Sequence, residues 1–269
     1  MTAAQNTYIF DQASERERAR LGGLSAQFDA VSIRHLTALG VAPGWHCLEI
    51  GAGAGSIARW LATTVGPTGR VVATDLDTRF LTDLPAPVEV RRHNIVTDPL
   101  PDGGFDLVHA RAVIEHLADR RDVVARLVPA LRPGGLLVLE DVVFGEVTRV
   151  ATARVAEPHA NAAAYVRALM AVAAGLGAVG ADSAFGLDLP DALEAAGLRD
   201  VDGELTARFV RGGSPEAAFY ELTLREVGDR LIAAGLLSPG DVADALAFTS
   251  EPASRWLSTA LATAWGRRP

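Results

Sequence analysis

The chain has 269 residues, of which 49% are hydrophobic, and it carries a formal net charge of −8. This acidic balance disfavours nucleic acid as a partner, and no apolar run reaches the ~18 to 20 residues that a membrane span needs. The single cysteine, Cys47, excludes an internal disulfide and a cysteine zinc cluster.

Two helices and a short strand are the first predicted elements in chain order. Residues 7–24 mix charged and apolar side chains, which predicts an N-terminal helix with a charged face. A second helical pattern covers about 25–39, and the apolar run 46–50 predicts the first strand. The opening residues lack the basic and apolar regions of a signal peptide, so we expect a cytoplasmic protein.

A glycine-rich loop follows this strand and is the most informative feature of the sequence. Gly51, Gly53 and Gly55 alternate with alanine, and a helical pattern over 56–65 follows at once. Glycine tolerates positive φ and has no Cβ to obstruct a ligand, while the first amides of the helix can face a nucleotide or a carboxylate. A plain tight turn is the alternative interpretation. Ser56 stands where a dinucleotide fingerprint requires glycine or alanine, which disfavours a nicotinamide cofactor.

The next strand, predicted at 70–74, leads into an acidic residue. Asp75 lies 24 residues beyond Gly51, near the distance at which a carboxylate after the second strand binds a ribose diol. Such a carboxylate accepts a hydrogen bond from each hydroxyl of the diol. Capping a helix is the alternative role for Asp75. It is the role that we expect of Asp77, ahead of a helix predicted at 77–83.

Strand and helix patterns alternate through the rest of the chain. The predicted elements are a helix at 119–131, strands at 88–92, 105–110 and 136–141, and a closing strand pair at about 199–210 and 260–267. This alternation predicts an α/β fold with a doubly wound, mostly parallel sheet covered by helices on both faces. Such sheets bind ligands at the carboxyl ends of their strands, near the point where the strand order reverses.

Five motifs, in this order and spacing, resemble those of the class I S-adenosylmethionine-dependent methyltransferases. The motifs are residues 48–55, 71–77, 93–95, 105–111 and the Leu-Arg-Pro-Gly-Gly-Leu turn at 131–136. The resemblance is strong over about residues 40–145 and loose elsewhere. It implies a seven-stranded Rossmann-like sheet with one late antiparallel strand, S-adenosylmethionine as the cofactor and a small molecule as the substrate.

The resemblance also implies which residues bind the cofactor. The loop glycines approach its methionine and ribose portion, Asp75 takes the ribose hydroxyls, and Leu76 packs on the adenine. Asn94 and Ile95 meet the adenine edge, and the Ala110 carbonyl accepts from the methionine ammonium. The whole predicted set is Glu49, Gly51, Gly53, Gly55, Asp75, Leu76, Asn94, Ile95 and Ala110.

A single methyltransferase domain is expected over residues 1–269, since the chain has no internal repeat and no low-complexity linker. Its expected parts are an N-terminal helical cap at 1–40, a cofactor-binding core at 41–145, a helical lid at 146–187, and a C-terminal half at 188–269 with a helical insertion at 214–251. By position, the lid resembles the substrate cover that this family inserts after the fifth strand.

Histidines near the fourth strand are the candidate general bases. His116, just beyond that strand, is the first candidate and His109, at its carboxyl end, is the second, because imidazole titrates near neutral pH. His159 on the lid is a third, and a structural role is the alternative for each. Glu115 is expected to point away from His116, since neighbours on a helix do not share a face.

No metal is expected in the site. Glu140 and Asp141 form the one adjacent acidic pair predicted at a strand end, and no Asp-Asn pair follows nearby. Either acid is expected to bind a polar substrate or a base, or to cap the loop.

These features together predict a methyltransferase that acts on an oxygen or nitrogen of a small molecule, such as a secondary metabolite. A nicotinamide dehydrogenase, a protein that binds S-adenosylmethionine without transferring methyl, and a carbon methyltransferase are the alternatives. The dehydrogenase is disfavoured because all 25 basic residues are arginine, which excludes a Tyr-x-x-x-Lys pair. The excess of arginine, alanine and glycine is typical of a GC-rich bacterial genome.

Overall fold

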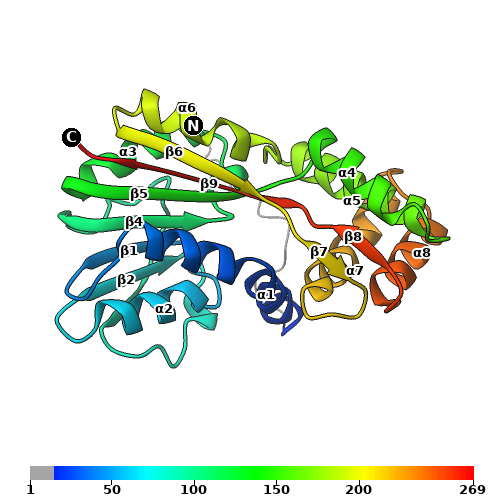
Figure 1. The fold of residues 1–269 in the computed structure, drawn as a ribbon, viewed down its shortest axis with the longest axis horizontal. Coiled ribbons are helices and arrows are strands. Elements are labelled where there is room, and N and C mark those ends of the chain that lie inside the picture. The colour runs from blue at the N-terminus through cyan, green and yellow to red at the C-terminus, as the bar shows by residue number, and fades with distance from the viewer. Residues whose placement is uncertain (1–14) are drawn as a thin grey trace.

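A seven-stranded sheet forms the centre of the molecule in the computed structural model, which describes residues 15–269 (Figure 1). The strand order is β3-β2-β1-β4-β5-β9-β6, and β9 is the antiparallel member. The strands are β1 (His46–Ile50), β2 (Arg70–Asp75), β3 (Val88–Arg92), β4 (Phe105–Arg111), β5 (Leu131–Val143), β6 (Arg199–Thr206) and β9 (Ala260–Arg267). The order reverses between β1 and β4, which places a ligand site at their carboxyl ends.

Alternating side chains on each strand supply two separate cores. Cys47 and Leu107 belong to the core beneath α1 (Glu15–Ala38) and α2 (Ser56–Val65). Leu48 and Val108, their neighbours along the same strands, belong to the core beneath α3 (Arg120–Leu127) and α6 (Leu189–Ala195). Helices therefore cover both faces of the sheet, and the predicted fold class is confirmed.

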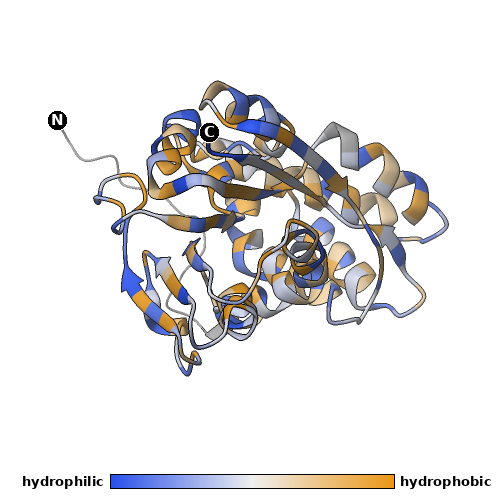
Figure 2. Ribbon diagram, turned by 60° about the vertical axis from the view of Figure 1, so that its left-hand side comes forward, coloured by the Kyte–Doolittle hydropathy of each residue, from blue (hydrophilic) through white to orange (hydrophobic). Residues whose placement is uncertain are grey.

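A helical lobe extends from the carboxyl end of β5 (Figure 1). It consists of α4 (Glu146–Ala156), α5 (Ala162–Ala178), α7 (Ala217–Ala233), α8 (Pro239–Ser250) and a small two-stranded sheet of β7 (Phe209–Arg211) and β8 (Arg255–Leu257). Its core centres on Trp256, which is fully buried. Hydrophobic and hydrophilic residues alternate along the helices in Figure 2, as amphipathic helices around a core require.

Some predicted boundaries differ from the structure. The helices predicted at 7–24 and 25–39 are one continuous helix, α1, as far as the described residues extend; residues 7–14 lie outside them. The helix predicted at 77–83 is wrong, because only a 3₁₀ turn at Thr78–Phe80 forms, although Asp77 caps it as expected. The strand predicted at 199–210 divides into β6 and β7.

Polar side chains form a row across the sheet near its carboxyl end. Glu49 of β1 is paired in register with His109 of β4. Glu140 of β5 is paired with Thr263 of β9, which is paired in turn with Glu204 of β6. Hydrogen bonds from α1 to both Glu140 and Glu204 show that this row faces α1. Within residues 15–269, no helix combines the length and apolar character that crossing a bilayer requires.

Candidate active site

A cleft with a volume of about 170 Å³ opens at the carboxyl ends of β1, β2 and β4. One end is lined by the glycine loop, Asp75 and the turn at 93–95. The other end is lined by apolar side chains of α1, α5, α7 and the end of β5 with the residue that follows it, namely Leu24, Val142, Phe144, Val172, Leu176 and Phe219. The cleft therefore joins a polar end to an apolar end, and both predicted helical insertions contribute to the latter.

The glycine loop has a backbone that other residues rarely adopt. Gly51, Gly53 and Gly55 all have positive φ, at 65°, 55° and 78°. A Cβ on Gly51 would lie 2.3 Å from a Val113 methyl group, so the loop packs closely against the residues that follow β4. Gly55 does not line the cleft. It is the N-cap residue of α2, and its place at the turn is structural.

Asp75 is held by the loop that it faces. Its carboxylate accepts hydrogen bonds from the Gly53 amide at 2.8 Å and the Asp77 amide at 3.1 Å. Burial raises the pKa of Asp75, and these amides act in the opposite direction. A fixed, half-buried carboxylate beside a loop without Cβ atoms fits the ribose of S-adenosylmethionine, the cofactor that the resemblance implies.

Most of the predicted cofactor residues are brought together. Glu49, Gly51, Gly53, Asp75, Leu76, Asn94 and Ile95 all line the cleft. The Asn94 side-chain oxygen accepts from the Val96 amide at 2.9 Å, so its own turn occupies that oxygen. Ala110 is buried and does not line the cleft. Because β4 continues to Arg111, Arg111 and Ala112 occupy the position predicted for Ala110.

His109 lies inside the sheet. It is completely buried and does not line the cleft, so the structure does not bring it to a substrate as the second candidate base. Its Nδ1 lies 2.7 Å from a Glu49 oxygen and its Nε2 lies 3.2 Å from a Glu140 oxygen. Carboxylates only accept hydrogen bonds, so this geometry favours a ring that is protonated on both nitrogens. Burial acts to lower the pKa of His109, but the two acids raise it to about 9.

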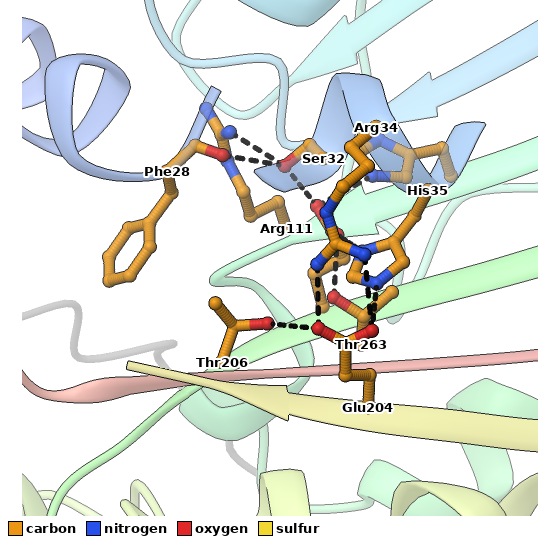
Figure 3. A network of polar contacts seen from close by, with 10 residues as sticks. Phe28, Ser32, Arg34, His35, Arg111, Glu204, Thr206 and Thr263 are labelled. Atoms are coloured by element: carbon orange, nitrogen blue, oxygen red, sulfur yellow. Dashed lines mark hydrogen bonds and ion pairs between the residues drawn. The ribbon is translucent and has the colours of Figure 1, made fainter. Parts of the chain in front are cut away.

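Glu140 is the centre of a buried network that reaches α1 through Ser32 and His35, and His35 in turn contacts Glu204 of β6 (Figure 3 labels these three partners). Glu140 accepts hydrogen bonds from Ser32 of α1 and, at 2.8 Å, from Thr263. Burial acts to raise the pKa of Glu140, yet the His109 hydrogen bond and its other partners hold it well below the ordinary range. Glu140 and its neighbour Asp141 are fully buried, and neither lines the cleft as a substrate ligand.

Arg111 connects this network to the cleft and was not anticipated from the sequence. Its guanidinium donates to Ser32 Oγ at 2.9 Å and to Asp29 at 2.7 Å (Figure 3 shows the Ser32 contact). Asp29 also accepts from Ser56 Oγ, at the start of α2, at 3.0 Å. Arg111 thereby fixes α1 against the glycine loop. A charged residue at the carboxyl end of the fourth strand was the available signal.

Glu115 and His116 form a pair in the cleft wall. His116 Nε2 lies 3.2 Å from a Glu115 oxygen, and both residues line the cleft. The expectation that Glu115 points away is wrong, because the segment is a single 3₁₀ turn at Ile114–His116. Glu115 is buried, and its second oxygen, Oε2, has no hydrogen-bond partner in the part of the chain that the structure describes. Burial and the Glu115 carboxyl raise the pKa of Asp141, which lies beneath the same turn.

His159, the third candidate base, lies away from the cleft. Its Nε2 is 3.3 Å from Ser254 Oγ, and its ring packs edge-on against Phe248 at 5.3 Å. These contacts give it a structural place in the helical lobe. Among the residues that the structure describes, no group of three or more His, Cys, Asp or Glu side chains is arranged to hold a metal ion.

Comparison with known proteins agrees with this geometry. Residues 48–139 match a family model described as a methyltransferase domain. The chain is 31% identical to methyltransferase str2 of Strobilurus tenacellus over 72% of this chain and 68% of that protein. It is also 32% identical to the ubiquinone/menaquinone biosynthesis C-methyltransferase UbiE of Ectopseudomonas mendocina over 38% of this chain and 43% of that protein.

The similar solved structures share the fold at low sequence identity. One is a putative methyltransferase from Bacillus halodurans, with a TM-score of 0.55 and 15% identity, covering 88% of this chain and 98% of that one. The chain spans 40% to 68% of the length of the curated relatives that it matches.

Proposed function

The chain belongs to the class I S-adenosylmethionine-dependent methyltransferases, and from this we propose that it methylates an oxygen or nitrogen of an uncharged small molecule. Its cofactor is S-adenosylmethionine. The observation that carries the proposal is that one cleft contains both the glycine loop with Asp75 and the Glu115–His116 pair. Residues that would bind the cofactor and a proton acceptor thus line the same cavity.

The bound cofactor supplies an electrophilic methyl carbon on a sulfonium, so the transfer is a displacement that depends on alignment. The glycine loop and Asp75 fix the position of the ribose. The apolar end of the cleft, with Val142, Phe144 and Phe219, binds the substrate and excludes water. We propose that α5 and α7 act together as the lid over this end.

His116 is proposed to accept the proton of the substrate hydroxyl or amine. Its side chain is 17% exposed and lines the cleft, whereas His109 is enclosed in the sheet. Glu115 at 3.2 Å orients the imidazole and stabilises its protonated form. General-base assistance of this kind contributes about 10²- to 10⁴-fold to turnover.

Charge in the cleft restricts the substrate. The cationic side chains that line it, Arg20 and Arg111, are bound by Glu17 and by Asp29 respectively. Glu115 leaves an acceptor near His116. A neutral substrate with a donor hydroxyl or amine therefore suits the cleft better than an anionic one.

The test is methyl transfer to defined acceptors. The protein is incubated with methyl-deuterated cofactor and a panel of phenols, amines and activated-carbon acceptors, and products and S-adenosylhomocysteine are measured by mass spectrometry. Labelled product from phenols or amines, lost in His116→Ala, supports the proposal. The UbiE match makes carbon methylation the second candidate, and label on carbon acceptors alone would favour it. S-adenosylhomocysteine binding without any labelled product would leave the alternative of a protein that binds the cofactor for another purpose.

A further inference from the structure

A small cavity within the helical lobe adjoins the apolar end of the cleft, and we call it the extension. This extension has a volume of about 20 Å³ and shares Phe144, Val172, Phe219 and Thr223 with the main cleft. A space of that size holds about one water molecule or one small chemical group. A molecule in the cleft can therefore reach the extension only with a slender end.

Four side chains that line the extension carry hydroxyl groups, and two of them are fully paired by the protein. Tyr220 accepts from Gln27 at 2.7 Å and from the Thr259 amide at 3.0 Å. Thr249 donates to the Leu246 carbonyl at 3.0 Å. These two hydroxyls serve the packing of the lobe.

The hydroxyl protons of the other two have no acceptor among the described residues. Thr223 is 6% exposed and its oxygen forms no hydrogen bond there, while Tyr165 is 3% exposed and its oxygen meets only the Trp256 indole N–H, which is a donor. Thr223 lies within α7, where a threonine commonly bonds the carbonyl one turn earlier, but this one does not. Buried hydroxyls without partners are rare because their desolvation is not compensated.

The missing partner is an acceptor. The Trp256 ring centroid lies 5.1 Å from that of Tyr165, and the Trp256 indole N–H, which can only donate, interacts with the Tyr165 oxygen. An indole N–H cannot receive the proton of Tyr165 or of Thr223. The side chains that line the extension include no arginine or histidine, so nothing there compensates an anionic oxygen. An uncharged oxygen is the group that satisfies these conditions.

We propose that the substrate is an elongated, largely apolar molecule with a carbonyl, ether or hydroxyl oxygen at its far end, which accepts hydrogen bonds from Thr223 and Tyr165. This rests on the proposed function, since the reacting hydroxyl or amine at the other end meets His116. The extension thus discriminates among apolar substrates by the oxygen that they carry at the end remote from the reacting atom.

A first experiment needs no ligand. Thr223→Val removes a hydroxyl that has no partner among the described residues, so its thermal midpoint should equal or exceed the parent value. Thr249→Val is the matched control, because it breaks a formed bond and should lower the midpoint by about 2 °C. A comparable loss in Thr223→Val would assign that hydroxyl to the folded structure and overturn the proposal.

A second experiment measures recognition directly. With S-adenosylhomocysteine present, calorimetry compares 4-alkylphenols of five to eight chain carbons with ketones of equal length that carry the carbonyl on the penultimate carbon. At one chain length the ketone should bind roughly 3- to 10-fold more tightly than its alkyl partner. Thr223→Val and Tyr165→Phe should remove this preference, and Thr249→Val should keep it.

In a purely apolar extension the alkylphenols would bind more tightly than the ketones, because the ketone carbonyl would lose its hydration without compensation. Equal binding, stronger binding of every alkylphenol, or no binding of either series would overturn the proposal. Methyl transfer to the same phenols is scored separately by mass spectrometry. Methyl transfer without tighter binding of the ketones would support the proposed function and contradict this inference. Tighter binding of the ketones without methyl transfer would support the extension's role in recognition and contradict the proposed function.

Discussion

Replacing His109 by glutamine is expected to destabilise the protein because it leaves two buried acids without their shared partner. Glu49 and Glu140 are 3% and 1% exposed, and the imidazole is within hydrogen-bond distance of both. Removing one member of a buried charged set costs about 3 to 5 kcal/mol in unfolding free energy. Ser32 and Thr263 still bond Glu140, so we expect the lower part of this range.

The pH dependence gives this prediction a sharper test. The pKa of His109 rises from 6.5 to about 9 on folding, so the folded protein binds the proton more tightly than the unfolded chain. The resulting stabilisation, about 3 kcal/mol, is complete below pH 6.5 and disappears as the pH rises through 9. The parent protein should therefore lose stability from pH 6.5 to 9 through this group, and His109→Gln should lack that component.

Urea unfolding at several pH values measures both effects, with His159→Gln as the control. The His159 side chain contacts Ser254 in the helical lobe and lies outside the sheet that holds Glu49 and Glu140, so His159→Gln should keep the His109 component of the pH profile. Parallel profiles for the parent and His109→Gln, or a loss below about 1 kcal/mol at pH 6.5, would refute the assignment of a protonated ring between two acids.

Four further outcomes are expected. Asp75→Ala should weaken S-adenosylhomocysteine binding in calorimetry by about one to two decades, through lost charge-assisted hydrogen bonds, and undiminished affinity would place the ribose contact elsewhere. His116→Ala should reduce turnover about 10²- to 10⁴-fold with unchanged cofactor affinity; full turnover with a normal circular dichroism spectrum would return His116 to a structural role. Gly51→Ala should abolish cofactor binding measured by fluorescence titration, since its Cβ would lie 2.3 Å from Val113 at a positive φ, and normal binding would mean that the loop adapts. Methyl transfer should survive EDTA, and its loss with recovery on adding magnesium would establish a metal requirement.

Sequence patterns predicted those parts of the fold that depend on residues close to one another along the chain. Asp75 follows Gly51 by 24 residues, with one helix between the two strands, so spacing alone indicated a shared site. The pairing of His109 with Glu49 joins positions 60 residues apart, and it depends on strand order and register. Glu115 was misplaced because an α-helical rule was applied to a 3₁₀ turn.

The partner of an unpaired group is harder still to anticipate from sequence. Thr223 lies in an amphipathic helix, where its type and spacing suit either a core position or a cavity wall. The Thr223 hydroxyl indicates a ligand only when the hydrogen bonds of the other hydroxyls that line the extension are known. Arg111 was missed for a similar reason, because its partners Asp29 and Ser32 come from a helix far earlier in the chain.

The continuous course of α1 has a consequence for the order of events in a catalytic cycle. Its first turns, including Leu21 and Leu24, line the cleft, and Phe28 packs edge-on against Phe219 of α7 at 6.4 Å. A Cβ on Gly23 would lie 2.6 Å from the Phe219 backbone, so the backbones of α1 and α7 are in close contact. Any displacement of α1 that admits the cofactor must also disturb α7. We therefore expect cofactor exchange and opening of the apolar end of the cleft to be one motion, with a compulsory order of binding and with release of S-adenosylhomocysteine as the slow step.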